Sequence, residues 1–364
     1  MFLTIVTFII ILSVLVLVHE MGHFFTAKKM GVKAEEFGIG LPPRIFGIKK
    51  GETTYSLNWI PFGGFVKIKG ESGEDKDDPD SFANKKIWQR CLILSNGVVM
   101  NFLLAVVLLS IGFLIGIPLS TDDLPGYAKV RDEKISIVEV AENYPAQEAG
   151  LKMGDALLSI DNQEFEEIKD VQNYIESKKS VIIKVERGGR ELDKEISTTQ
   201  EDDGRNVIGV ALAKTGIVSF PWYLALWGGL KATFNLTLQI IIVLFFLFKK
   251  LFFQGTLISE VSGPVGVAVM THTMVEMGFV YILQFAALIS INLGIINFLP
   301  FPALDGGRVL FLILEKIRGK PVNQRVEAVI HNVGFIFLIF LMFLVTYRDF
   351  VRFGGKIWQK IIGG

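Results

Sequence analysis

The sequence has very little cysteine and histidine, and neither sign of charge is in excess. Cys91 is its only cysteine, which excludes a disulfide within the chain and a cysteine-based zinc cage. The 37 basic and 37 acidic residues cancel, so no overall field attracts nucleic acid, and we expect no nucleic-acid partner. A metal site would have to combine carboxylates with some of only four histidines: His19, His23, His272 and His331.

Apolar residues, in contrast, are abundant and clustered. They make up 51% of the chain, mean hydropathy is +0.46, and the long apolar runs predict membrane spans rather than one soluble core. The run Phe2 to Val18 has no basic region before it and no small-residue cleavage site after it, so it is predicted to be a span and not a secretory signal. Lys28, Lys29 and Lys33 follow this run and predict an outside N-terminus by the positive-inside rule.

The pattern predicts a polytopic α-helical membrane protein with about four transmembrane helices, a membrane-associated β-hairpin or sheet, and one inserted α+β domain. The expected segments are a first transmembrane helix (1–27), a cytoplasmic-side or membrane-associated β region with an acidic loop (28–90), a second transmembrane helix (91–118), the inserted domain (124–215), interfacial helices (216–278), a third transmembrane helix (279–307), a connecting helix (308–326), a fourth transmembrane helix (327–347) and a tail (348–364).

The sharpest chemical signal is the motif His19-Glu20-Met21-Gly22-His23 at the end of the first span. Histidines four residues apart lie on one face of a helix, so both imidazoles can reach one metal ion. Zinc lowers the pKa of a bound water from about 15.7 to about 7, and Glu20 lies beside the histidines as a general base. Such polar groups are costly at the end of an apolar span, which favours a functional role over a chance match.

A catalytic zinc usually takes three protein ligands. His272 and His331 are poor candidates, because histidines in such segments are more often packed or interfacial. Asp305 is a better one: it ends a second apolar span, in the run Asn297-Phe298-Leu299-Pro300-Phe301-Pro302-Ala303-Leu304-Asp305-Gly306-Gly307. A broken helix at membrane depth is tolerated only where it is buried in protein or lines a polar cavity. A capping aspartate in a turn is the simpler alternative, and the incomplete zinc motif favours the metal role.

These two motifs together resemble those of the site-2 protease family, and within it the bacterial regulator of sigma-E protease group. The resemblance covers nearly the whole chain and extends to Phe82-Ala83-Asn84-Lys85, Arg90, Asn101, Ser262 to Gly266 and Asn292 to Asn297. It implies zinc ligands His19, His23 and Asp305, Glu20 as the base, and substrate contacts at Asn297 and also at Asn292, Pro300 and Pro302. One departure is Ser95-Asn96-Gly97, where the family often has Ala-Gly-Pro.

The inserted domain is similar to a PDZ domain around Asn143 to Asp155 and Leu157 to Asp161. A PDZ domain binds an extended peptide at a sheet edge. A spacer or filter that binds no peptide is the alternative, because no carboxylate-binding loop is recognisable. The glycine-rich stretch 38–69 is also predicted to offer a sheet edge near the zinc, where an unwound substrate can pair; a hairpin that only packs is the alternative.

The predicted function is an intramembrane zinc metalloprotease that cuts transmembrane segments of single-span proteins, such as anti-sigma factors or remnant signal peptides. The predicted location is the bacterial inner (plasma) membrane, multi-pass and in contact with lipid, with the active site toward the cytoplasm and the PDZ-like domain outside. A non-catalytic, zinc-bound PDZ scaffold is the main alternative, and Glu20 argues against it. A zinc transporter is a second alternative, but it would carry ionisable groups at several depths.

Two rules disagree over Trp222 to Phe248. The run is long enough to span, and Lys249-Lys250 after it conventionally marks the cytoplasm. A full crossing would, however, reverse the direction of the third transmembrane helix. That helix must run inward to bring Asp305 to the depth of the two histidines. Lys231, Asn235 and Gln239 also form a polar stripe along this helix. We therefore expect it to lie along the outer interface, with a fifth span paired with a re-entrant segment as the alternative.

Overall fold

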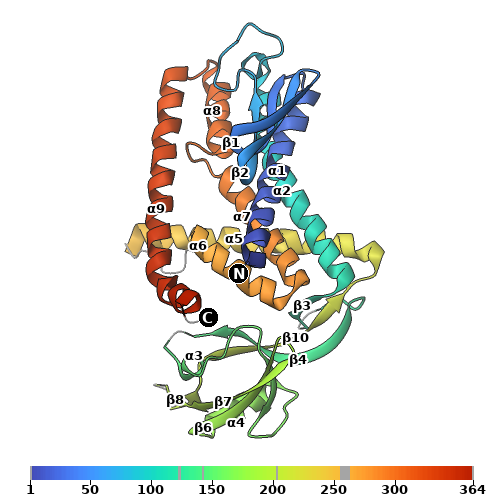
Figure 1. Ribbon diagram of the computed structural model, residues 1–364, viewed down its shortest axis with the longest axis vertical. Helices are drawn as coiled ribbons and strands as arrows, with labels where there is room; N and C mark the ends of the chain where they lie inside the picture. Colours follow the sequence, from blue (N-terminus) through green and yellow to red (C-terminus); the bar gives the residue numbers. More distant parts are fainter. Residues whose placement is uncertain (1, 122–123, 142, 202–203, 255–262, 363–364) are drawn as a thin grey trace. The chain divides into compact units, whose positions relative to one another are not determined.

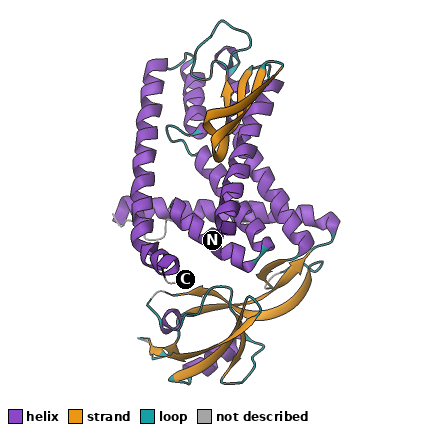
Figure 2. Ribbon diagram, in the orientation of Figure 1, coloured by secondary structure: helices purple, strands orange, loops and turns teal. Residues whose placement is uncertain are grey.

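The computed structural model describes residues 2–121, 124–141, 143–201, 204–254 and 263–362. The chain forms two compact units, one made of Met1–Ser110 with Gly229–Gly364 and the other of Ile111–Gly228. The first is mainly helical and the second mainly strands (Figures 1 and 2). The strand-rich unit is thus inserted between the two parts of the helical one.

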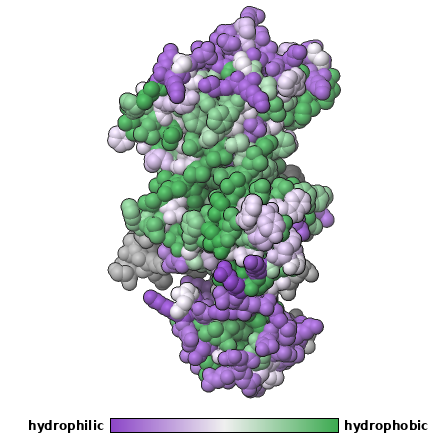
Figure 3. All heavy atoms as spheres, turned by 90° about the vertical axis from the view of Figure 1, so that its right-hand side faces the viewer, coloured by the Kyte–Doolittle hydropathy of each residue, from purple (hydrophilic) through white to green (hydrophobic). Residues whose placement is uncertain are grey.

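The first unit is built on helices, most of which are long and apolar. They are α1 (Phe2–Lys29), α2 (Ile87–Ile115), α5 (Trp222–Gln254), α6 (Pro264–Met277), α7 (Phe279–Phe298), α8 (Asp305–Arg318) and α9 (Gln324–Ile362), with a 3₁₀ turn at Phe82–Asn84. Within the described residues, five are long and apolar enough to cross a membrane: α1, α2, α5, α7 and α9. Figure 3 shows a largely hydrophobic surface over this helical region and hydrophilic residues at the end that carries the loop after β2. The unit thus has the character of a multi-pass membrane protein.

The directions of the long helices alternate. In Figure 1, α1 and α7 run toward the end that carries the β-hairpin, and α2 and α9 run back from it. α5 lies crosswise to these helices in the same view. It packs through a stripe at every fourth residue, Ala232, Leu236, Ile240 and Leu244, against buried side chains of α2 and α7. Its polar residues Lys231, Asn235 and Gln239 are exposed.

The hairpin of β1 (Ala34–Lys50) and β2 (Thr53–Ile68) folds back on itself. Residues 36–39 pair with 54–57 on one side and with 64–67 on the other, so the far end of β2 becomes an outer edge. Gly63 has a φ of 67° just before that edge, a conformation that glycine adopts without strain. Several apolar side chains of the hairpin are exposed, Trp59 at 68% among them.

The second unit is built on a six-stranded sheet in the order β3-β10-β4-β5-β6-β7. Its elements are β3 (Ile117–Ser120), β4 (Lys129–Val140), α3 (Pro145–Glu148), β5 (Ala156–Ile160), α4 (Ile168–Glu176), β6 (Ser180–Arg187), β7 (Arg190–Ser197), β8 (Thr199–Gln200), β9 (Asn206–Val207) and β10 (Val210–Ser219). The core lies between this sheet and the helices and includes Ile137, Ile160, Val171, Val185 and Ile196.

A buried ion pair fixes the turn before β5. Asp155 is fully buried, and Arg187 donates to both of its carboxylate oxygens at 2.6 Å. The backbone N–H of Lys152 donates to the same carboxylate at 2.9 Å. The hydrogen bond to Asp155 raises the pKa of the Arg187 guanidinium above its ordinary value. Both oxygens of the buried carboxylate therefore have hydrogen-bond partners, as a buried pair requires.

The structure differs from the expected segments in three helices. α5 is one unbroken helix, and it makes the number of span-length helices larger than the four expected. α8 begins at Asp305 rather than 308, since an acidic residue is favoured in the first turn of a helix. α9 continues through the segment expected to be a separate tail. The expected interfacial segment 216–278 includes residues 255–262, which lie outside the described residues.

Candidate metal centre

Three side chains from distant parts of the sequence converge at one point in the helical unit. His19 Nε2 lies 3.0 Å from Asp305 Oδ2, and His23 Nε2 lies 3.4 Å from the same oxygen. The two Nε2 atoms are 3.1 Å apart. Zinc bonds of 2.0–2.1 Å in a tetrahedral arrangement place ligand atoms about 3.3 Å from one another. The three atoms are therefore spaced as ligands of one zinc ion.

The opposite nitrogen of each imidazole is held by a hydrogen bond. His23 Nδ1 donates to the backbone oxygen of Ile93 at 2.9 Å, so the neutral ring carries its proton there and Nε2 is a free acceptor. His19 Nδ1 faces the side-chain amide of Asn101 at 3.3 Å. Turning the amide over places Oδ1 where Nδ2 lies, so that Oδ1 accepts from His19 Nδ1 and leaves His19 Nε2 as a free acceptor. Two free nitrogens and a carboxylate oxygen then face one another, an arrangement that a cation stabilises.

Glycines give these histidines their space. A Cβ on Gly97 of α2 would lie 2.7 Å from the Cε1 atoms of both His19 and His23. On the facing helix, a Cβ on Gly22 would lie 2.8 Å from Gly97 Cα. The two helices thus touch through their backbones beside the site, and Asn96 Nδ2 donates across the contact to the oxygen of Gly22 at 3.2 Å. Small residues allow this close approach between membrane helices.

Asp305 is brought to the histidines by a break between two helices. α7 ends at Phe298, and Pro300 and Pro302 prevent it from continuing. We call residues 299–304, between α7 and α8, the ligand loop. After this loop, Gly306 and Gly307 pack on backbone oxygens of Phe298 and Phe301, too closely for any side chain. The sharp turn places Asp305 at the start of α8 with its carboxylate toward His19 and His23.

Glu20 is next to the two histidines but has a different partner. Its Oε2 accepts a hydrogen bond from the backbone N–H of Val66 at 3.0 Å. Val66 lies on the outer edge of the hairpin, in the part of β2 that pairs with residues 34–39. The carboxylate is therefore held beside the metal site and at a sheet edge at the same time.

The other residues singled out from the sequence lie at varied places. Asn297 Nδ2 is 3.5 Å from His19 Nε2, next to the three ligand atoms. Asn292 donates to the backbone oxygen of Leu288 in its own helix at 3.1 Å. Pro300 is exposed, and Pro302 packs against Gly334 of α9. His272 hydrogen-bonds Thr4 at 3.0 Å, and His331 accepts the N–H of Ala303 at 2.9 Å.

Three residues of this site were not recognised as part of it from the sequence. Gly97 lies in the departure from the family pattern, Val66 lies within the glycine-rich stretch 38–69, and Ile93 lies within the predicted second span. Each acts through its backbone or through the lack of a side chain, so no residue type marks it. The one sequence signal for this part of the site is Gly97, a small residue four positions before Asn101 that allows close helix packing.

Comparison with known proteins gives a consistent family. The model of peptidase family M50 matches residues 7–341. The regulator of sigma-W protease RasP of Bacillus subtilis (strain 168) is 32% identical over 439 residues, covering 96% of this chain and 98% of that protein. Zinc metalloprotease RasP of Geobacillus kaustophilus (strain HTA426) is 30% identical over 435 residues, with the same two coverages of 96% and 98%.

Among solved structures, the PDZ domain of the SdrC-like protein Lmo2051 from Listeria monocytogenes is 28% identical, covers 23% of this chain and 92% of that chain, and has a TM-score of 0.21. The family match, in contrast, covers both motifs of the metal centre. The resemblance stated from those motifs is confirmed: the chain belongs to peptidase family M50, and it is an intramembrane zinc metalloprotease.

Proposed function

We propose that His19, His23 and Asp305 hold the catalytic zinc and that Glu20 is the general base. The observation that carries this proposal is the convergence of three acceptor atoms within 4.8 Å of one another from two distant motifs. The name of the Geobacillus kaustophilus relative, zinc metalloprotease RasP, supports the choice of metal. Asn101 and the Ile93 carbonyl orient the imidazoles, and such outer partners usually matter to metal affinity.

Zinc bound at these residues would lower the pKa of a water and polarise the scissile carbonyl. Glu20 takes a proton from the attacking water and passes it to the amine that leaves. Its hydrogen bond from Val66 keeps the carboxylate in place before substrate arrives. Asn297, 3.5 Å from His19 Nε2, is close enough to hold the peptide group that is being cut.

The outer edge of β2 is the proposed substrate platform. A transmembrane helix hides its peptide bonds in its own hydrogen bonds, so it has to unwind before hydrolysis. Among the described residues, 64–68 have a strand partner on one side only, and Val66 on this edge donates to the base. An unwound substrate can add to this edge as a strand and come to lie along the site. Asn292, Pro300 and Pro302 are proposed as further substrate contacts.

The proposed substrates are transmembrane segments of single-span proteins, with anti-sigma factors and remnant signal peptides as the two classes. The name of the Bacillus subtilis relative, regulator of sigma-W protease, supports the first class. The proposed location is the bacterial inner membrane, with the metal centre toward the cytoplasm and the PDZ-like unit outside. The alternating directions of α1, α2, α7 and α9 in Figure 1 support a multi-pass arrangement of the helical unit.

The experiment that tests the proposal separates metal binding from chemistry. Purified protein should contain one zinc, and Asp305→Ala, His19→Ala or His23→Ala should each lower the zinc content and abolish cleavage of a transmembrane substrate. Glu20→Gln should keep the zinc and lose turnover by roughly 100- to 10,000-fold. Full activity in Asp305→Ala, or near-native rates in Glu20→Gln, would refute the corresponding assignment.

A further inference from the structure

The ligand loop has an unusual backbone immediately before Asp305. Ala303 has a φ of 75°, in the left-handed region that residues other than glycine rarely occupy. The conformation costs free energy, so neighbouring groups must hold it in place. Because Asp305 follows two residues later, the path of the chain at Ala303 sets the direction in which the carboxylate points.

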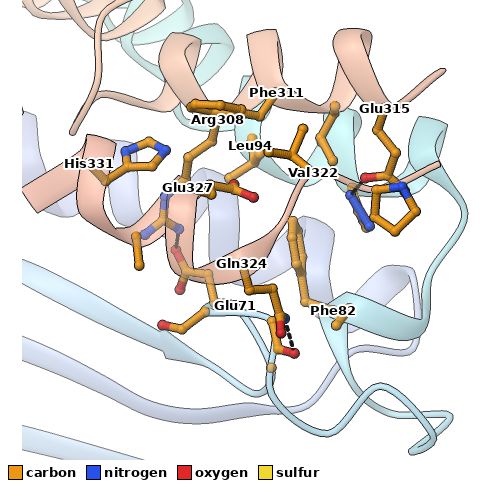
Figure 4. Close-up of a pocket in the computed structure, with 18 of the residues that line it drawn as sticks. Glu71, Phe82, Leu94, Arg308, Phe311, Glu315, Val322, Gln324, Glu327 and His331 are labelled. Carbon is orange, nitrogen blue, oxygen red and sulfur yellow. Dashed lines mark hydrogen bonds and ion pairs between the residues drawn. The ribbon is translucent and has the colours of Figure 1, made fainter. Parts of the chain in front are cut away.

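A single side chain takes up the backbone donor of Ala303. His331 Nδ1, on α9, accepts the N–H of Ala303 at 2.9 Å. A neutral imidazole that accepts at Nδ1 carries its proton at Nε2. The ring lies 5.4 Å from that of Phe311, and Figure 4 shows it beside Phe311 and Arg308 at one end of a pocket of about 310 Å³. Nε2 has no hydrogen-bond partner among the described residues, so the bond to Ala303 is the ring's specific interaction there.

The same face of α9 makes two further contacts with the ligand loop. A Cβ on Gly334 would lie 2.8 Å from the backbone oxygen of Pro302, so the α9 backbone comes directly against the loop. The ring of Phe337 lies 5.8 Å from that of Phe301. Residues 331, 334 and 337 are spaced by three and therefore share one face of the helix. α9 thus packs against the ligand loop along one face, and His331 Nδ1 is a hydrogen-bond acceptor on that face.

We propose that His331 is a positioning residue of the metal centre: it holds the backbone of Ala303 so that Asp305 points at His19 and His23. This inference rests on the proposed role of Asp305 as a zinc ligand. It differs from the sequence interpretation of His331 as a merely packed or interfacial histidine. The difference is chemical, because a positioning role needs an acceptor at the place of Nδ1 and a packing role needs only volume.

The test compares His331→Asn with His331→Leu in the full-length protein. Asn and Leu side chains have nearly the same shape, and Asn Oδ1 is attached to Cγ just as His Nδ1 is. H331N therefore keeps an acceptor where H331L has none. The readouts are the affinity for zinc, measured by competition with a chelator, and the cleavage of a transmembrane substrate. Val333→Ala, on the same helix at a residue that is 61% exposed, is the matched control.

We expect H331L to lose zinc affinity by about 10- to 100-fold, as is typical for outer partners of a metal ligand, and H331N to stay close to the native protein. Equal loss in both variants, native behaviour in both, or failure of both to accumulate would overturn the positioning role, since H331N retains the acceptor. Asp305→Asn serves as the reference. If D305N keeps its zinc, the ligand assignment fails; if D305N loses zinc while H331L keeps it, only the present inference fails.

Discussion

At the scale of single residues, the most constrained position of the metal centre is Gly97. Its Cα faces both imidazoles, and any side chain would occupy space that the rings fill. We expect Gly97→Ala to displace His19 and His23, at a cost of about 1–3 kcal/mol in stability from overpacking, and to lower both zinc content and cleavage. Zinc content by mass spectrometry and a cleavage assay check this.

Gly126→Ala is the control for Gly97→Ala, because a Cβ there meets no atom within 4 Å. It should leave both readouts unchanged. A G97A protein with native zinc content and native cleavage would show that the two imidazole rings have room to move. This outcome would contradict the constraint that we infer from the close α1–α2 contact.

The chemistry of the site could be predicted from the sequence, whereas its supports could not. His19, Glu20 and His23 form a local pattern with a known helical geometry, and Asp305 stands out as a carboxylate after two prolines. Gly97, Val66 and His331 contribute through contacts that exist only once α2, β2 and α9 have packed. Each of these contacts is set by a helix crossing or a strand register, which a single sequence does not encode locally.

At the scale of elements, the ion pair between Asp155 and Arg187 fixes the turn that leads into β5. Asp155→Ala leaves a partly buried Arg187 without its partner, and breaking a buried pair costs about 3 kcal/mol or more. We expect residues 111–228 of this variant to become sensitive to protease at a lower urea concentration than in the native full-length protein.

The neighbouring residue supplies a matched control for that change. Glu186 pairs with Lys134 at the surface, and Glu186→Ala should cost less than about 1 kcal/mol. If D155A and E186A resist protease equally well, the buried pair is not what stabilises the turn.

The crosswise course of α5 bears on the topology of the chain. Trp222, Tyr223 and Trp227 at its start are 58–80% exposed, as in aromatic belts at membrane interfaces, and its packed stripe leaves the opposite face free. In a Cys91→Ser background, we expect a single cysteine at Lys250 to react from outside intact cells with a membrane-impermeant thiol reagent. The reason is that an interfacial helix keeps both of its ends on one side.

The control for this experiment is a single cysteine at Lys28, which the proposed topology places in the cytoplasm. It should react only after the membrane has been opened. If the cysteine at Lys250 also reacts only after the membrane has been opened, α5 crosses the membrane. Lys249 and Lys250 then mark its cytoplasmic end, as the positive-inside rule predicts.

At the scale of the whole molecule, the PDZ-like unit interrupts the chain between the histidine-bearing and aspartate-bearing parts. We propose that it excludes substrates whose extracytoplasmic domains have not been trimmed. Deletion of residues 127–213 should then allow cutting of an untrimmed substrate. The deletion retains β3 and residues 215–218 of β10, which pair with each other, so the two ends stay together.

The assay compares trimmed and untrimmed forms of one substrate with the native protein and the deletion variant. The native protein should cut only the trimmed form, and the deletion variant should cut both at similar rates. A folded, active deletion variant that still prefers the trimmed form would argue against a filter. Glu20→Gln in the deletion variant controls for other proteases.

The length of chain between the ligands also determines when the enzyme can first act during its biosynthesis. His19 and Asp305 are 286 residues apart, and the loop that presents Asp305 packs against α9, the last helix among the described residues. A chain still attached to the ribosome therefore has its histidines in the membrane long before the loop has its final shape. We therefore expect the protease to stay inactive next to other newly inserted segments until α9 has been made and has packed against the ligand loop.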